Sequence, residues 1–279
     1  MIKKECFTTE WIEQVSSELH YNDKNLIEKV IRALSLLEML VKAGCPLVFK
    51  GGTALMLILG KSAHRLSIDI DVICPPGTNI EDYLKSFADF GFINLELVER
   101  KQRDDADIPK SHSKFFYQIA YRNDTDAQSY ILLDVLYEDI HYFQTRQIAI
   151  DCPFIRLEGE PLMVTVPSAE DILGDKLTAF APNTTGIPYY KNGRSCSMEI
   201  AKQLYDVGRL FENVSGLQIT SEAFRKIALV ELSYRSLGTD IGQVFNDIRQ
   251  TALCISTRGK AGEGDFELIQ DGIIRVKSF

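Results

Sequence analysis

The chain has 279 residues, of which 45% are hydrophobic and 25% are charged, and it carries a net charge of -8. This composition excludes a fibrous or disordered protein, and the length suits one large domain or two lobes. The negative charge argues against a protein that wraps DNA without regard to sequence, because a local basic patch would have to overcome the overall repulsion.

The apolar residues are spread through the chain, with no uninterrupted run of about eighteen and no secretory leader pattern at the first residues. We therefore expect a cytoplasmic protein that does not associate with a membrane. The six cysteines include no close pair typical of a zinc ribbon or a redox dithiol. We therefore expect the cysteines to be reduced thiols with a structural role.

The first half of the chain predicts an α+β domain. Apolar residues at helical spacing predict helices over 8–44, which end at Gly44. Short apolar runs then predict strands, with helices expected between them at 53–59 and 80–90. The last three strands are expected to be mostly antiparallel, and the full set of expected strands is 47–49, 66–74, 93–98, 115–121 and 130–137.

The second half predicts a mainly helical lobe after a β-rich connector at 148–166. We place the domain boundary near residue 160, which gives domains 1–160 and 161–279. The loop 182–194 carries two adjacent tyrosines between glycines and prolines and is a candidate substrate-facing segment. The helices expected in this lobe are 168–181, 197–211, 221–234 and 239–251.

A glycine turn joins the first expected strand to a helix at Lys50-Gly51-Gly52-Thr53. Glycines at such a turn expose backbone N–H groups and a helix N-terminus, which favour a bound anion such as a triphosphate. The alternative is a tight turn without a ligand. The turn makes Gly51, Gly52 and Thr53 candidates for NTP binding.

The next expected strand carries two aspartates. Alternation along a strand would place Ser67, Asp69 and Asp71 on one face, with the two carboxylates roughly 7 Å apart. Like charges held so close favour a shared cation. A solvent-exposed alternating strand is the alternative.

A third aspartate, Asp134, stands in the otherwise apolar strand Ile131–Leu136, where a lone carboxylate is costly to bury. On a strand beside Asp69 and Asp71 it would complete a three-carboxylate site for Mg²⁺ or Mn²⁺ with NTP phosphate oxygens. Asp134 is also the candidate base for an attacking hydroxyl. A structural carboxylate with a hydrogen-bond or arginine partner is the alternative.

Several other kinds of site lack support in the sequence. The aspartates are not followed by the glycine and glutamate of a calcium loop, and neither a Walker phosphate loop nor a serine-hydrolase elbow occurs. The histidines are dispersed along the chain, and no two of them have the spacing of a zinc-binding pair. They are His20, His64, His112 and His141.

The segments Lys50-Gly-Gly-Thr-Ala-Leu and Arg65-Leu-Ser-Ile-Asp-Ile-Asp resemble the first motif of the AbiEii-type nucleotidyltransferase toxins, a family that includes AbiGii and MenT-like members. Farther on, Asp171-Ile-Leu-Gly-Asp-Lys-Leu and Ala201-Lys-Gln-Leu-Tyr-Asp-Val resemble two more family segments. The resemblance spans about residues 45 to 210 and implies a nucleotidyltransferase fold with a mixed sheet and a helical C-terminal lobe.

The resemblance also implies roles for residues beyond the glycine turn. Ser67, Lys176 and Lys202 are expected to contact the NTP, and Arg65 either joins them or braces its loop. Without the family, Lys176 would be taken for a surface lysine. Gln203 departs from the family, whose members often have an aspartate there. The expected catalytic residues are Asp69, Asp71, Asp134, Lys176 and Asp206.

Members of this family act in toxin–antitoxin and abortive-infection loci beside a separate antitoxin, and some relatives add nucleotides to tRNA acceptor ends. The resemblance thus implies an enzyme that moves an NMP from an NTP to an acceptor such as tRNA, with an antitoxin partner. A non-catalytic nucleotide-binding module is one alternative. A small-molecule, antibiotic-type nucleotidyltransferase is the other, because a fold does not fix the acceptor.

Overall fold

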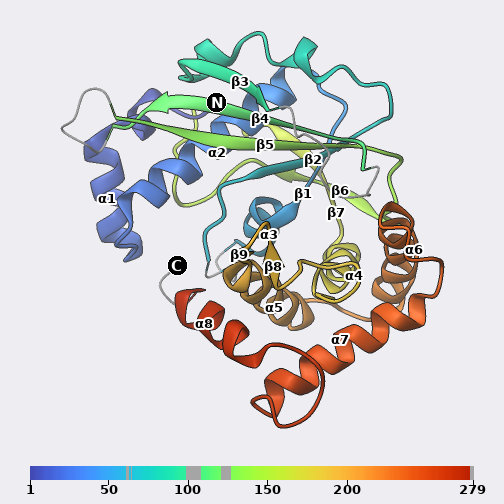
Figure 1. Cartoon of the computed structure of the whole chain (residues 1–279). Coiled ribbons are helices and arrows are strands. Elements are labelled where there is room, and N and C mark those ends of the chain that lie inside the picture. Colours follow the sequence, from blue (N-terminus) through green and yellow to red (C-terminus); the bar gives the residue numbers. More distant parts are fainter. Residues whose placement is uncertain (61–62, 64, 99–107, 121–126, 277–279) are drawn as a thin grey trace. The chain divides into compact units, whose positions relative to one another are not determined.

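The structure is a computed structural model that describes residues 1–60, 63, 65–98, 108–120 and 127–276 (Figure 1). The chain separates into two compact units. The first contains the described residues within 1–101, 109–140 and 145–167, and the second contains those within 102–108, 141–144 and 168–279. The domain boundary near residue 160 stays a prediction.

The first unit begins with the predicted helices. A short 3-10 helix η1 (Lys4–Phe7) precedes α1 (Thr9–Leu19) and α2 (Lys24–Lys42). The side chains of Thr8 and Asp23 cap α1 and α2 by accepting hydrogen bonds from backbone N–H groups of the first turns. Most of α2 is buried, so it is the central helix of this unit's core.

A five-stranded sheet packs against α2, with the strand order β1-β2-β5-β4-β3. β2 and β5 run parallel, and the other neighbours are antiparallel. Helix α3 (Gly51–Leu59) follows β1 directly. This mixed sheet confirms the predicted α+β class, and its strands are β1 (Val48–Lys50), β2 (Ile70–Cys74), β3 (Asn94–Val98), β4 (Lys110–Gln118) and β5 (Gln128–Tyr137).

The predicted strand 66–74 is wrong in its first half, because β2 begins only at Ile70. Lys50, the last residue of β1, pairs with Asp71, and the chain then turns into α3. The described residues 65–69 therefore have no β1 residue to pair with. Thr53 in α3 donates its hydroxyl hydrogen bond to the Asp69 carbonyl instead, at 2.7 Å.

The predicted helix 80–90 is also wrong, because this segment forms two 3-10 helices, η3 (Ile80–Tyr83) and η4 (Phe87–Phe90). Bonds of the i to i+3 type tie the backbone here, from Leu84 to Glu81 and from Phe87 to Leu84. The predicted β-rich connector is confirmed as the antiparallel pair β6 (Thr145–Ala149) and β7 (Met163–Pro167).

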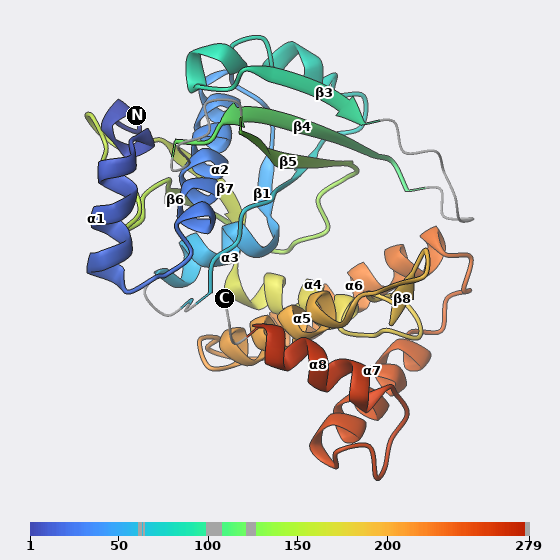
Figure 2. The same cartoon turned by 60° about the vertical axis from the view of Figure 1, so that its left-hand side comes forward.

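The second unit is mainly helical, as predicted. Helix α4 packs against α5 and α6, and α8 packs against α5, which lies beside it in Figure 2. The structure adds α8, which the sequence did not predict. None of the helices within the described residues is long and apolar enough to span a membrane. The elements are α4 (Ala169–Ala179), β8 (Tyr190–Lys191), β9 (Arg194–Ser195), α5 (Ser197–Phe211), α6 (Gln218–Tyr234), α7 (Ile241–Ser256) and α8 (Phe266–Val276).

Candidate active site

Four polar residues form one row across the sheet of the first unit. Asp71 on β2 pairs in register with Lys50 on β1 and with Asp134 on β5, and Asp134 pairs with His112 on β4. Residues opposite one another on adjacent strands share a face of the sheet. The row therefore lies on one face, and the buried residues that alternate with it face the core, among them Ile70, Val72, Leu133 and Val135.

The two aspartates at the centre of this row are like charges on adjacent strands, an arrangement that is unfavourable by itself. Lys50 at one end of the row and His112 at the other supply basic groups. The Nδ1 atom of His112 forms a hydrogen bond with Oδ1 of Asp134, and the exposed fractions of the two side chains are 7% and 33%. The structure thus places a basic residue beside each carboxylate.

Gly51 brings the backbone at the start of α3 against the carboxylate of Asp71. Its φ is +79°, and a Cβ atom built on it would lie 2.1 Å from Oδ2 of Asp71. A side chain at this position would collide with the carboxylate, and the positive φ would strain any other residue. The predicted glycine turn and Asp71 therefore belong to one site.

Gly52 makes a similar close approach to the loop before β2. A Cβ atom on it would lie 2.6 Å from Oγ of Ser67 and 3.0 Å from Nη2 of Arg65. The second terminal nitrogen of this guanidinium, Nη1, donates a hydrogen bond to the Leu66 carbonyl at 3.2 Å. Arg65 thus braces its own loop beside the N-terminus of α3. By contrast, the Thr53 side chain is fully buried, and its hydroxyl bonds to the Asp69 carbonyl.

Among the described residues, no group of three or more acidic, histidine or cysteine side chains is placed to hold a metal, and the three-carboxylate site stays a prediction. Asp69 is exposed and lies just before β2, while Asp71 and Asp134 stand side by side. Mg²⁺ usually takes one or two carboxylates and completes its shell with water and phosphate oxygens. The adjacent pair fits such an ion, and the metal role of Asp69 stays a prediction.

In the second unit, three of the residues singled out by the sequence lie together. Nζ of Lys176 on α4 lies 2.9 Å from Oδ2 of Asp206 on α5 and donates a hydrogen bond to Oε1 of Gln203 at 3.0 Å. The exposed fractions of the Lys176 and Asp206 side chains are 11% and 1%. Lys176 is therefore not a surface lysine. Lys202 precedes Gln203 on α5, and its contact with NTP stays a prediction.

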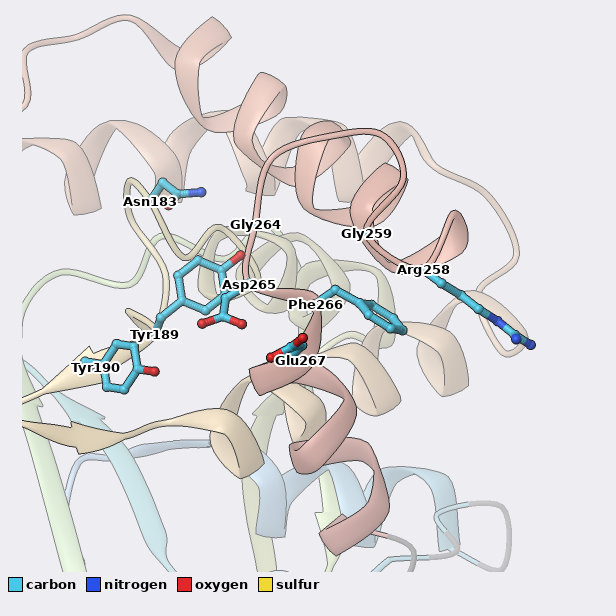
Figure 3. A pocket seen from close by; sticks show the side chains of 9 residues that line it. All are labelled: Asn183, Tyr189, Tyr190, Arg258, Gly259, Gly264, Asp265, Phe266 and Glu267. Atoms are coloured by element: carbon cyan, nitrogen blue, oxygen red, sulfur yellow. The ribbon is translucent and has the colours of Figure 1, made fainter.

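The second unit also contains an open pocket of about 730 Å³ (Figure 3). The predicted substrate-facing loop supplies Asn183, Tyr189 and Tyr190 to its lining. Burial raises the pKa of the Tyr189 phenol, whereas the Tyr190 ring is largely exposed. The other lining residues come from the loop between α7 and α8 and from the first turn of α8, and they are Arg258, Gly259, Gly264, Asp265, Phe266 and Glu267.

Comparison with known proteins identifies the family. Residues 33–271 match the family described as "Nucleotidyl transferase AbiEii toxin, Type IV TA system". The chain belongs to this family. It is a nucleotidyltransferase of the AbiEii type, as the resemblance of its motifs implied. No curated protein is similar enough to the chain to count as a match.

Among solved structures, the AbiEii-type chain is similar to MenT4, a nucleotidyltransferase toxin from Mycobacterium tuberculosis. The TM-score is 0.51 at 12% sequence identity, and the match covers 95% of this chain and 98% of MenT4. A weaker likeness links the chain to JHP933 from Helicobacter pylori, with a TM-score of 0.40, 17% identity, and coverage of 93% and 95%. The likeness to MenT4 shows a shared fold.

Proposed function

We propose that this AbiEii-family member is a toxin that transfers an NMP from an NTP to a macromolecular acceptor, with tRNA as the first candidate, in a reaction that depends on Mg²⁺ or Mn²⁺. The observation that carries the proposal is the adjacent pair Asp71 and Asp134, with Gly51 packed against the carboxylate of Asp71. The family also makes a cognate antitoxin the expected protein partner.

The triphosphate would bind at the N-terminus of α3. Backbone N–H groups of Gly51 and Gly52 lie at that end of the helix, where the helix dipole favours an anion. Ser67 and Arg65 stand against Gly52 and add a hydroxyl and a guanidinium beside it. This grouping supports NTP binding at the turn through backbone donors and two side chains.

The acceptor hydroxyl would attack the α-phosphorus of the NTP, the bond from that phosphorus to the β-phosphate oxygen would break, and pyrophosphate would leave. Asp134 would take the proton of the attacking hydroxyl. A divalent ion held by Asp71 and Asp134, with Asp69 as a further ligand, would neutralise phosphate charge and acidify the attacking hydroxyl.

Lys176 has a separate role in the proposal. Its ammonium group would contact the triphosphate, since a lysine can follow phosphate charge as it moves to the leaving pyrophosphate. Asp206 and Gln203 fix the direction of that ammonium group through contacts of 2.9 and 3.0 Å. We assign Lys202 to the NTP as well, on the family segment alone.

The test is transfer of label from each α-labelled NTP into total cellular RNA or protein in the presence of Mg²⁺. We compare the unaltered protein with Asp69→Ala, Asp71→Ala and Asp134→Ala, and use Asp89→Ala, an exposed aspartate on η4, as the matched control. The proposal expects label in an RNA band from the unaltered protein and from Asp89→Ala only.

Other outcomes point elsewhere. NTP binding without incorporation into any acceptor would indicate a non-catalytic module, and label in a small molecule would indicate an antibiotic-type enzyme. Transfer that persists in Asp71→Ala at the unaltered rate would remove the adjacent aspartates from the mechanism.

A further inference from the structure

His112 lies directly against the proposed catalytic carboxylate. It stands on β4 opposite Asp134 on β5, and its Nδ1 atom bonds to one carboxylate oxygen, Oδ1. The imidazole is 7% exposed, so its neighbours hold the ring in place, while the Asp134 side chain is 33% exposed. The histidine thus forms the buried side of a pair whose carboxylate reaches solvent.

A carboxylate held through one oxygen keeps the other for a further partner, because the two oxygens together offer about four acceptor sites. A bond to a fixed ring also removes rotational freedom from the aspartate side chain. That restriction matters here because Asp71 stands beside Asp134 in register, and repulsion between the two would otherwise favour rotamers that separate them.

We propose that His112 is a positioning residue for nucleotidyl transfer, which holds the carboxylate of Asp134 in the orientation that the acceptor hydroxyl and the divalent cation require. His112 does not touch substrate and acts through Asp134. The inference rests on the proposed function, since it assigns His112 to the same site.

The tests use variants of His112 that differ in where they place a hydrogen-bond donor to Asp134, so that the effect of the donor can be told from the effect of losing the ring. His112→Asn places an amide where the Nδ1 atom lies, His112→Gln places one near the other ring nitrogen, and His112→Leu removes the donor. Lys114→Leu is the control, since Lys114 lies on the same strand and face but pairs with Leu132 and contacts Glu96.

We expect His112→Leu and His112→Gln to lower kcat about 10–100-fold, the usual effect of removing a group that orients a metal-binding side chain. KM for the NTP should change little, because the histidine does not contact the phosphates. His112→Asn should recover most of kcat, and Lys114→Leu should keep it. A residue with a merely structural role would not produce this split or this rescue.

A second readout does not depend on turnover. Binding of Mn²⁺ in the presence of a non-hydrolysable NTP analogue, followed by electron paramagnetic resonance, should weaken about 10–100-fold in His112→Gln and much less in His112→Asn. Thermal unfolding of each variant establishes that it is folded. If His112→Leu does not fold, the contrast between His112→Asn and His112→Gln carries the test.

The outcomes separate the two proposals. An unaltered protein that neither transfers a nucleotide nor binds Mn²⁺ contradicts the proposed function itself. An unaltered protein that transfers, together with a His112→Gln variant of unchanged kcat and Mn²⁺ affinity, leaves the proposed function in place and overturns the role of His112.

Discussion

Lys176 and Asp206 form an ion pair between α4 and α5 of the second unit, with 2.9 Å between Nζ and Oδ2 and little exposure of either side chain. Removal of one member of a buried pair leaves a charge that has lost both water and its partner. Substitution of either residue is therefore expected to lower the stability of this unit and to weaken the proposed contact of Lys176 with the triphosphate.

We expect Lys176→Met and Asp206→Asn each to lower the free energy of unfolding by about 3 kcal/mol, the usual cost of breaking a buried ion pair. The double variant should lose clearly less than the sum, because the two residues contact each other. Urea unfolding of all four proteins measures the coupling. Strictly additive losses of stability would contradict a direct interaction between Lys176 and Asp206. All three variants should also lose transfer activity.

Gly51→Ala tests the close approach between the turn and Asp71. The new methyl group would overlap Oδ2 of Asp71 at a backbone φ of +79°. Gly44→Ala is the matched control, since Gly44 has a φ of +76° and no atom within 4 Å of the added Cβ. Both variants place an alanine at a similar positive φ, which costs about 1–3 kcal/mol.

Only Gly51→Ala also displaces the carboxylate of Asp71. We expect nucleotidyl transfer to fall by at least about 100-fold in Gly51→Ala and to persist in Gly44→Ala, since 1 Å of misplacement costs about that much. The two rates are measured under saturating NTP, with thermal unfolding to show that both proteins are folded. Equal activity in the two variants would separate Gly51 from the site.

The sequence predicted the α+β class, the glycine turn and the strands that carry Asp71 and Asp134, because periodicity and glycine placement are local signals. It did not predict which strands pair. The parallel register of β2 with β5 joins segments about sixty residues apart, and no local pattern specifies it.

The sequence does not single out His112 for the same reason. In the sequence it is one of four dispersed histidines, and only the register of β4 against β5 places it opposite Asp134. The available signal was weak. The strand expected at 115–121 starts after this histidine, whereas β4 begins at Lys110, and the polar segment 110–114 carries no apolar alternation that would indicate a strand.

Glu38 gives the first unit a pH dependence of stability. The residue is 1% exposed, and burial raises the pKa of its carboxyl above the ordinary value, partly offset by a hydrogen bond from the Ile2 backbone N–H. Because the pKa of this carboxyl is higher in the folded than in the unfolded state, the group stabilises the fold fully at pH values below its ordinary pKa. The contribution declines as pH rises through the folded-state pKa.

We therefore expect Glu38→Gln, which cannot ionise, to gain stability relative to the unaltered protein as pH rises from about 4.5, with a slope of at most about 1.4 kcal/mol per pH unit. Urea unfolding between pH 4.5 and 8 measures the difference. The exposed Glu10→Gln is the control and should show no comparable trend. A flat difference for Glu38→Gln would contradict the raised pKa.

Substitution of Tyr190 tests whether the acceptor is an RNA. Its ring is 60% exposed and lines the pocket of the second unit, where an unpaired base could stack on it. The same lining carries the carboxylates of Asp265 and Glu267 against one guanidinium, that of Arg258, and this net negative charge disfavours a phosphate contact. The proposed contact is therefore with a base rather than with the RNA backbone.

Stacking of one base is worth about 1–3 kcal/mol, so Tyr190→Ala should raise KM for an RNA acceptor about 5–150-fold and leave KM for the NTP unchanged. Tyr190→Phe keeps the ring and should keep the KM. The control is Phe245→Ala, which removes a ring of similar exposure, 63%, from α7 outside the pocket lining. An equal effect of Tyr190→Ala and Phe245→Ala would mean that the acceptor does not use this pocket, because the response would then follow the loss of any exposed ring.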